Sequence, residues 1–431
     1  MARSGGRGVS IGIVTRFWHP FADMGLVEER GELVLERGEG ARVWDEQGRS
    51  YLDATAALWY CNVGYGRAEI ADAAAAQIRK IPAYSAYADL ATRPAVDLAE
   101  RLAALAPLDD ARVFFTSGGA ESIESAAKLA RRYFSLTGEP ERTVLISRQR
   151  AYHGVAGFGT SLAGADIFRE GIAPPVPDVV HVAWDSADAL RDAIEQVGAE
   201  RVAAFFCEPV IGAGGVLAPP PGYLAEVQSI CRDAGCLLVA DEVITSFGRL
   251  GHWFASERFQ LDPDLIAFAK GSTSGYLPLG GVIASGRVAE PFWRPGGGVI
   301  FRHGYTYSGH AAVCAASHAN LDILERDGLI ARGLELEREL EEALEPLADH
   351  PLVAEIRSGT GVMAAVQLTE PALAERASLL AREHGVITRV LLGGALQISP
   401  PLVITRAELD EIATALAGAL EACLAAAATP A

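Results

Sequence analysis

The sequence predicts an α/β protein with a mostly parallel central sheet in a large domain and a smaller α+β domain. Short apolar segments alternate with helical segments between about residues 95 and 285. Buried strands that alternate with helices are typical of a parallel sheet with right-handed crossovers. Beyond about residue 310, a long helical region precedes a group of strands, which favours a separate α+β unit. The length of 431 residues suits two or three domains.

The N-terminal region is expected to form an irregular arm up to about residue 35. A hairpin follows, which joins residues 41–44 to residues 50–52 through a turn at Asp45 to Gly48. The strands of the large domain are short apolar runs, and they span residues 112–116, 143–147, 179–183, 202–207, 236–240, 266–269 and 281–284. The expected helices between the arm and residue 285 span residues 68–81, 95–105, 120–134, 187–197 and 224–232.

The C-terminal part is helical from about residue 310 to 347 and continues with a strand region over residues 353–368. A helix, a strand pair and a closing amphipathic helix over 413–428 complete the chain. We divide the chain into three regions: an N-terminal arm with part of the small domain (1–60), the large domain (61–325) and the C-terminal small domain (326–431).

The charge balance is acidic, because 37 basic residues face 55 acidic ones for a net charge of −18. This charge argues against a basic groove for nucleic acid and against binding to an anionic membrane. The six cysteines are scattered and lie mostly in apolar surroundings, which indicates a reduced, cytoplasmic protein. Cys231 and Cys236 lie five residues apart without a second pair, so we expect no zinc site.

Three histidines have a spacing that would place them on one face of a continuous helix; they are His303, His310 and His318. Gly304 and Gly309 argue against a helix between the first two. We therefore expect no metal site at these histidines.

Lys270 stands where a buried apolar strand meets a glycine-rich loop. Lysines are rarely buried unless they are paired. One cause of such a placement is covalent use of the amine, because burial keeps a lysine neutral enough to form a Schiff base with a carbonyl group. The alternative is a lysine whose amine reaches from the strand end into water.

Three further features follow strands of the same predicted sheet. Residues 116–121 (TSGGAE) start a helix, where backbone amides suit a phosphate group, although packing turns of this kind are common. Asp241 ends an apolar strand and needs a partner such as a protonated ring nitrogen, unless it caps a helix or is structural. Tyr152 can stack on a flat ligand, or it is an ordinary core or surface tyrosine. Together with Lys270, these groups meet at the edge where open α/β sheets bind ligands, and pyridoxal phosphate can use all four.

Three longer motifs are more specific: DEVITSFGR at 241–249, AKGSTSGYLP at 269–278 and HGYTYSGH at 303–310. With these motifs the chain resembles the class III (omega-type) aminotransferases of pyridoxal-phosphate fold type I, over nearly its whole length from His19 to Leu402. The resemblance implies that Lys270 is the Schiff-base lysine and that Asp241 pairs with the pyridinium nitrogen, both as catalytic residues. It also implies that residues 61–325 form the cofactor-binding domain.

The resemblance implies further contacts to the cofactor, from Ser117, Gly118, Gly119, Ala120, Tyr152, His153, Glu208, Val243 and Thr306. Tyr152 and Val243 would pack on the two ring faces, and Glu208 would support the hydroxyl side. Thr306 would reach the phosphate in the neighbouring subunit, which implies a homodimer with shared active sites, or a tetramer. One departure stands out: family members usually carry Ser-Gly-Ser before the glutamate that matches Glu121, whereas residues 118–120 are Gly-Gly-Ala here. Backbone amides would then hold the phosphate, with Ser117 adjacent.

Within the family, the chain is closest to the amine–pyruvate branch. Substrate-binding positions of that branch match Phe21, Trp59, Tyr152, Ala213 and Arg389. In the branch, the arginine at the position of Arg389 binds a substrate carboxylate and swings out for an apolar amine. The alternative for Arg389 is a solvated charge at a strand end.

The implied function is transfer of an amino group from an amine or amino acid to a keto acid such as pyruvate, or to an aldehyde. The mechanism would be ping-pong, with Lys270 as the group that moves the proton. Alternatives are a diamine- or 4-aminobutyrate-type aminotransferase, and an aminomutase or lyase of the same class. A cofactor-sensing regulator would need an added DNA-binding domain, for which the chain has no spare basic segment.

Overall fold

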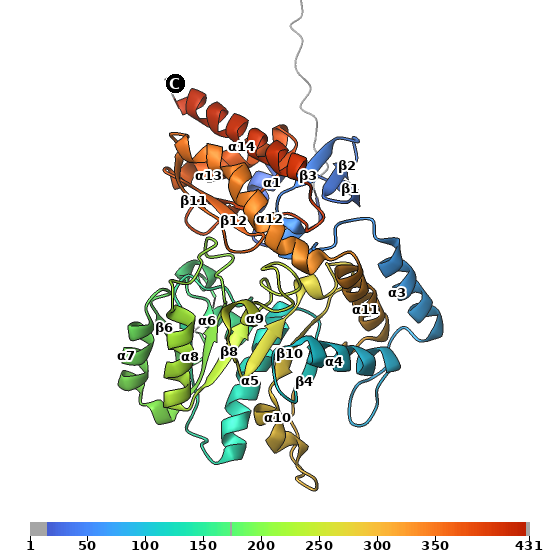
Figure 1. The fold of residues 1–431 in the computed structure, drawn as a ribbon, viewed down its shortest axis with the longest axis vertical. Coiled ribbons are helices and arrows are strands. Elements are labelled where there is room, and N and C mark those ends of the chain that lie inside the picture. Colours follow the sequence, from blue (N-terminus) through green and yellow to red (C-terminus); the bar gives the residue numbers. More distant parts are fainter. Residues whose placement is uncertain (1–14, 173–174, 428–431) are drawn as a thin grey trace, which may run out of the picture.

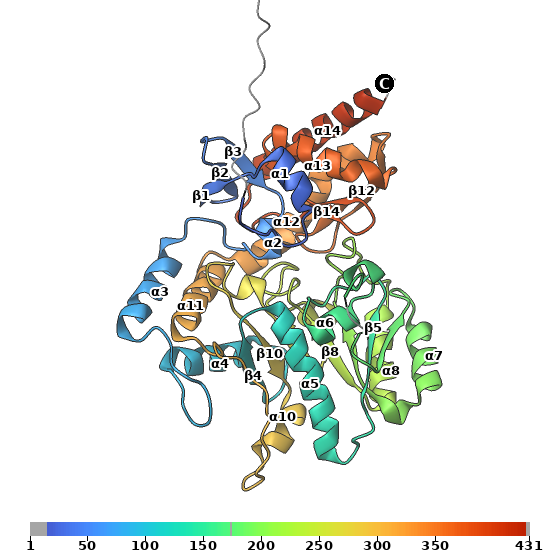
Figure 2. The same cartoon turned by 180° about the vertical axis from the view of Figure 1, so that it is seen from behind.

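The computed structural model describes residues 15–172 and 175–427, and within them the chain forms three sheets with helices around them (Figures 1 and 2). The first part of the predicted arm, residues 1–14, and residue 428 of the predicted closing helix lie outside these ranges. The seven-stranded sheet occupies the lower part of Figure 1, and the two four-stranded sheets lie above it.

The seven-stranded sheet has the order β4-β10-β9-β8-β7-β5-β6. Its strands are β4 (Arg112–Thr116), β10 (Gly280–Ala284), β9 (Leu265–Phe268), β8 (Leu237–Asp241), β7 (Val202–Cys207), β5 (Val144–Arg148) and β6 (Val179–Val182). The five strands from β9 to β6 are parallel, and β10 runs antiparallel to both its neighbours. The prediction of a mostly parallel sheet is confirmed. Because β4 has the direction of the parallel strands, the carboxyl ends of six strands share one edge.

Helices cover both faces of this sheet. α5 (Gly119–Thr137), α6 (Gly157–Leu162) and α10 (Gly286–Trp293) pack on one face, which Figure 2 shows from the front. α7 (Ala187–Val197) and α8 (Tyr223–Ala234) pack on the other. Side chains of β5 divide between the two faces, with Leu145 toward α5 and Ile146 toward α8. Such strands, buried on both faces, are expected to be uniformly apolar. α3 (Ala68–Lys80), α4 (Arg93–Leu105) and α11 (Ala311–Arg326) pack together beside β4.

The two smaller sheets combine segments from both ends of the chain. One contains β1 (Leu35–Glu39), β2 (Arg42–Asp45), β3 (Ser50–Asp53) and β13 (Val386–Ile387), and the other contains β11 (Val353–Arg357), β12 (Ala364–Leu368), β15 (Ala395–Ile398) and β14 (Val390–Leu391). β13 pairs in parallel with β3, so the predicted hairpin adjoins the C-terminal region. α12 (Leu329–Leu344), α13 (Ala374–Glu383) and α14 (Arg406–Ala427) complete this part. The division at residues 60 and 325 stays a prediction.

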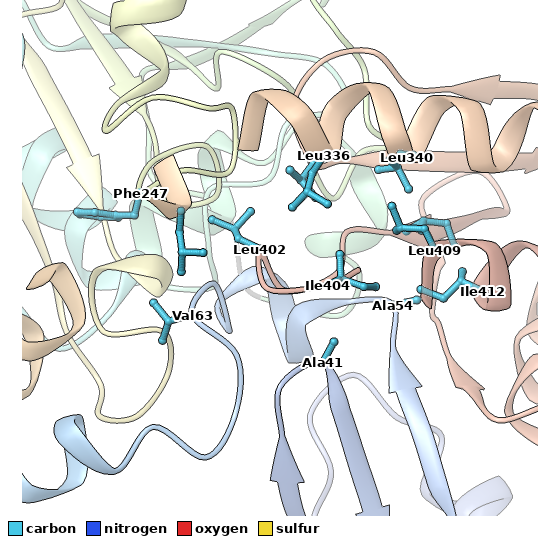
Figure 3. Packing of buried hydrophobic residues seen from close by; sticks show 14 of the residues in the cluster. Ala41, Ala54, Val63, Phe247, Leu336, Leu340, Leu402, Ile404, Leu409 and Ile412 are labelled. Atoms are coloured by element: carbon cyan, nitrogen blue, oxygen red, sulfur yellow. The ribbon is translucent and has the colours of Figure 1, made fainter. Parts of the chain in front are cut away.

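A continuous hydrophobic core connects the two parts of the molecule. Figure 3 shows Val63 and Phe247 from the large part on the same side of the cluster as Leu402, with Leu336 and Ile404 beyond it. All five are buried. Burial of such side chains contributes about 1.5–3 kcal/mol each, so the cluster holds the smaller sheets against the carboxyl edge of the large sheet.

Several elements differ from the sequence prediction. The arm is not irregular throughout, because Asp23 caps a short helix, α1 (Met24–Arg30), through its bonds to the amides of Gly25 and Leu26. β1 has the sequence LERGE without apolar alternation, and it exists through its pairing with β2. Short helices were missed as well, α2 (Ala56–Trp59), α6, α9 (Ala255–Phe259) and α10. The last helix begins at Arg406, because Thr405 and Glu408 form a reciprocal capping pair.

Candidate functional site

A cavity of about 180 Å³ opens at the carboxyl edge of the large sheet. Loops after β4, β5, β7, β8 and β9 supply its lining, which is where parallel sheets place their ligand sites. Eight of the predicted site residues line it together: Gly119, Ala120, Tyr152, His153, Glu208, Asp241, Val243 and Lys270. Four residues that the sequence did not single out complete the lining: Leu58, Ile123, Gly154 and Ile244.

Lys270 follows β9 after one intervening residue and lines the cavity. Burial lowers the pKa of Lys270 to about 8, while the negative charge of Asp241 opposes this shift. The backbone of Lys270 has φ +43°, which a side-chain-bearing residue adopts at a cost. An amine with a lowered pKa loses its proton more readily than an ordinary lysine, which suits it to nucleophilic attack on a carbonyl carbon.

Asp241 and His153 form a buried pair in the lining of the cavity. Nδ1 of His153 lies 2.7 Å from Oδ2 of Asp241, and the Val243 amide donates to Oδ1 over 3.1 Å. Nε2 of His153 is buried and has no hydrogen-bond partner within the described part of the chain. The pair therefore fixes the carboxylate, so that its charge is available to a cation in the cavity. The sequence named both residues but did not predict this contact.

Glu208 holds the loop that carries Tyr152. Its Oε1 accepts from the Tyr152 amide over 3.1 Å, and its Oε2 accepts from the Gly212 amide over 2.9 Å. Burial raises the pKa of Glu208. The guanidinium of the fully buried Arg148 donates to the Glu208 main-chain carbonyl, and the negative charge of Glu208 acts to raise the pKa of Arg148. Arg148 is a residue that sequence reasoning missed, although a charged residue at the end of the apolar run of β5 is a usable signal.

The turn before α5 presents the start of a long helix to the cavity. No side chain caps this helix, and its first residue, Gly119, lines the cavity with Ala120. The Glu121 carboxylate accepts from the Ser117 amide over 2.7 Å, which fixes the turn. An uncapped helix start leaves amide donors and positive potential for an anion. Ser117 and Gly118 precede the lining residues and are not part of the lining.

The predicted substrate-binding residues are less completely assembled than the cofactor-binding ones. Trp59 is buried next to Leu58 and packs with Ile244, whereas Phe21 is 77% exposed beside α1 and α13, away from the cavity. The Ala213 carbonyl accepts from the Leu392 amide over 3.3 Å. Ala213 therefore lies beside the loop that follows Arg389. Thr306 is exposed and does not line the cavity of the same chain.

Arg389 belongs to the electrostatic neighbourhood of the cavity. Its positive charge acts to lower the pKa of both Lys270 and Tyr152, and burial lowers its own pKa to about 10. Nε of Arg389 donates to Oε1 of Gln397 over 2.5 Å. Gln397 is a second residue that the sequence analysis missed. A glutamine inside the apolar strand Ala395–Ile398 is the signal, because a buried amide requires partners.

Other classes of site receive no support within residues 15–172 and 175–427. No group of three or more His, Cys, Asp or Glu side chains in these ranges is arranged to hold a metal ion. Across the same part of the chain, the helices are too short or too polar to cross a membrane. His303, one of the three spaced histidines, lies in a loop and bonds to Ser125.

The chain matches known proteins over nearly its full length. Residues 27–420 match the model of the family described as aminotransferase class-III. A putrescine–pyruvate aminotransferase of Pseudomonas aeruginosa is 38% identical over 424 residues, with 92% of each chain covered. An (S)-enantioselective omega-transaminase of Thermomicrobium roseum is 39% identical, with a TM-score of 0.91 and 94% of this chain and 96% of that one covered.

A third comparison, with the omega transaminase of Pseudomonas jessenii in a complex with PMP, gives 33% identity and a TM-score of 0.91 over 95% of this chain and 96% of that one. These matches confirm the predicted fold, pyridoxal-phosphate fold type I, because each structural match spans the large sheet and both smaller ones. They also agree with a cavity that joins a lysine of lowered pKa, a hydrogen-bonded carboxylate and a helix start. The chain therefore belongs to the class III aminotransferases and is an aminotransferase.

Proposed function

We propose that the cavity holds pyridoxal 5'-phosphate and that the enzyme uses it to transfer amino groups. The donor set fits this group: the Lys270 amine for the aldehyde carbon, Asp241 for the ring nitrogen, and the start of α5 for the phosphate. The cofactor would lie against Val243 and Tyr152, with Glu208 and His153 beside it. The observation that carries the proposal is the meeting of Lys270 and the His153–Asp241 pair in one buried cavity.

When bound, the cofactor supplies an electron sink for the bond broken at the substrate carbon. The residues of the chain supply the rest. Nζ of Lys270 acts first as a general base, which takes the proton from the donor's carbon. It then acts as a general acid, which gives the proton back in the following step. The Asp241 carboxylate keeps the ring nitrogen protonated, and His153 holds that carboxylate in place. Transfer runs in two half-reactions, so the kinetics are expected to be ping-pong.

The donor is proposed to be an amine or amino acid, and the acceptor a small keto acid such as pyruvate, or an aldehyde. The relative named a putrescine–pyruvate aminotransferase supports both pyruvate as an acceptor and a diamine as a donor. A panel of donors tests the proposal: each is mixed with the purified holoenzyme in the absence of an acceptor, and formation of pyridoxamine phosphate is measured. Absence of pyridoxamine phosphate with amines, diamines and amino acids alike would overturn it.

The assembly is proposed to be a cytoplasmic homodimer, or a tetramer, in which Thr306 of one copy reaches the phosphate site of the other. Thr306 is exposed and is not among the lining residues of its own cavity, which supports this arrangement. Light scattering measures the mass of the assembly in solution. A monomer that is fully active would contradict the shared site.

The packing of Gly119 on Val243 gives a prediction for cofactor retention. A Cβ on Gly119 would lie 2.7 Å from Cγ1 of Val243, whereas a Cβ on Gly118 has no atom within 4 Å. We expect Gly119→Ala to weaken cofactor binding by about 1–3 kcal/mol, the usual cost of overpacking. Gly118→Ala is the matched control and should bind like the wild type. Equal affinities of both variants in a titration of the cofactor-free protein would contradict the proposed packing.

The lowered pKa of Lys270 gives a second prediction, for the cofactor-free protein. The pKa of the Lys270 amine is about 8. At a pH below this value most of the amine is protonated and unreactive, and at a pH above it most of the amine is neutral. The rate at which trinitrobenzenesulfonate labels Lys270 should therefore rise about tenfold between pH 7 and 9 and then level off. Nα-acetyl-lysine, whose amine has an ordinary pKa of about 10.4, is the control and should keep gaining reactivity above pH 9. Parallel pH profiles for Lys270 and this control would contradict the shift.

Arg389 gives a third prediction, about the substrate class. A guanidinium can pair with the carboxylate of a keto acid through two hydrogen bonds and can turn away for an apolar group. We expect Arg389→Ala to lower kcat/KM for pyruvate. The loss should correspond to about 1.5–3 kcal/mol of transition-state stabilisation, the contribution of a hydrogen bond to a charged group. An uncharged aldehyde acceptor, tested with the same donor, should lose much less. Equal losses for both acceptors would show that Arg389 is structural.

A further inference from the structure

Two cysteine side chains meet at the end of α8, on the side of the large sheet opposite to the functional site. Gly235 ends the helix with φ +68° and donates to the Arg232 carbonyl over 3.1 Å, while the Cys236 amide donates to the Cys231 carbonyl over 3.1 Å. This pair of bonds defines a Schellman motif, in which the residues at the positions of Cys231 and Cys236 pack their side chains together. Sγ of Cys236 lies 3.7 Å from the Cys231 carbonyl oxygen.

Both cysteines border a cavity. Cys231 and Cys236 both line a cavity of about 480 Å³ at the amino edge of the sheet, between the end of α8 and the segments that carry Asp264 and Ser285. Both residues are buried, with 2% of Cys231 and 3% of Cys236 exposed. The other cysteines, Cys61, Cys207, Cys314 and Cys423, are buried and do not line this cavity.

The surroundings make the two thiols unequal. Arg142 donates to the carbonyls of Ala199, Val202 and Ala234, which places its positive charge at the end of α8. The pKa of Cys236 is lowered by a hydrogen bond from Cys231 and by the charge of Arg142, although burial and Asp264 oppose the shift. The hydrogen bond to Cys236 and burial raise the pKa of Cys231. In the resting pair the Cys236 thiol donates to the Cys231 carbonyl. The charge of Arg142 at the end of α8 favours loss of the Cys236 proton, which marks Cys236 as the attacking cysteine and Cys231 as the resolving one.

We propose that Cys231 and Cys236 form a redox site that a peroxide converts to a disulfide. The Cys236 thiolate attacks one oxygen of hydrogen peroxide; a sulfur–oxygen bond forms, the oxygen–oxygen bond breaks, and hydroxide leaves to become water. Cys231 then attacks the Cys236 sulfur, the sulfenic oxygen leaves as a second water, and the sulfur–sulfur bond forms. The two thiols lose two protons and two electrons, which reduce one peroxide to two waters.

The experiment uses the reduced holoenzyme, an equimolar amount of hydrogen peroxide, and alkylation by N-ethylmaleimide after denaturation. Of the six cysteines, four should be alkylated, and the mass of the chain before alkylation should fall by about 2 Da, the two thiol hydrogens. Peptide mapping should place the disulfide between Cys231 and Cys236, and dithiothreitol should restore all six thiols. Six alkylated thiols after peroxide, or a disulfide between other cysteines, would overturn the proposal.

Single variants separate the two roles. In Cys231→Ser, dimedone should trap a sulfenic acid on Cys236, because no thiol remains to displace it. In Cys236→Ser, oxidation of Cys231 should be roughly tenfold slower or more, since its thiol lacks the help of Arg142. Cys314→Ser is the control and should form the disulfide like the wild type, with unchanged transaminase turnover as the check on folding. If Cys231 is oxidised equally fast in Cys236→Ser, Cys236 is not the attacking cysteine, and the mechanism is refuted.

Discussion

Lys270→Ala should abolish transamination. The variant removes both the amine that would bind the cofactor's aldehyde carbon and the group that moves the proton in each half-reaction. A positioned general acid–base group contributes up to ~10⁴-fold, so we expect a loss in kcat of at least that size. The visible absorbance of the lysine-bound cofactor should vanish as well, while the phosphate site at the start of α5 remains. Both quantities are measured on the purified variant after incubation with the cofactor.

The chain offers a sharp control for this assignment, because it has three lysines, Lys80, Lys128 and Lys270. Lys80 ends α3, and Lys128 pairs with Glu124 over 2.9 Å on α5. Lys128→Ala should therefore keep wild-type turnover and absorbance. Reduction of the holoenzyme with borohydride followed by peptide mapping should place the cofactor on Lys270. A label on Lys80 or Lys128 would refute the role of Lys270.

The catalytic constellation could be predicted from sequence because its members follow strands. Asp241 and Lys270 each come directly after an apolar run, or one residue later, and runs of that kind pack as parallel strands. Glu208 also follows a strand, but only the family resemblance pointed to it. Since the carboxyl ends of parallel strands share an edge, neighbouring strands bring these residues together whatever their separation in the chain. The cavity confirms that they meet. The roles assigned to them remain predictions.

Contacts between loops could not be predicted in the same way. His153 and Asp241 are 88 residues apart, and their hydrogen bond depends on the path of the loop after β5, which no strand register fixes. The contact of Arg389 with Gln397 depends on β14, a strand of two residues, which is too short to show an alternating apolar pattern in the sequence. Thr306 lies outside the cavity of its own chain, so its predicted role depends on a second copy. β1 was missed because it is a polar edge strand: its hydrogen bonds to β2 stabilise it, and its sequence shows no apolar alternation.

Asp241→Asn should cost catalysis far more than folding. The amide has the shape of the carboxylate: its oxygen can accept from the Val243 amide, and its NH₂ group can donate to Nδ1 of His153 when that nitrogen carries no proton. What the amide lacks is the negative charge that would keep the cofactor's ring nitrogen protonated and electron-withdrawing. Removal of one preorganised electrostatic group costs ~10²–10³-fold in kcat, so we expect a loss of at least ~100-fold. Steady-state turnover and thermal unfolding of the same preparation measure the two effects separately.

Asp264→Asn is the matched control, because Asp264 also accepts a backbone hydrogen bond beside β8 but lies at the opposite, amino edge of the sheet. It pairs with Arg287 there, so its loss should lower the melting temperature without a comparable loss of turnover. The two variants thus separate a carboxylate that faces the cofactor site from one that supports the sheet. Glu208 carries another carboxylate in the cavity lining, but the amides of Tyr152 and Gly212 hold it in place, so the amide variant lacks a charge at the position of Asp241. Near-normal turnover in Asp241→Asn would then mean that the ring nitrogen needs no anionic partner here, and the proposed role of Asp241 would be refuted.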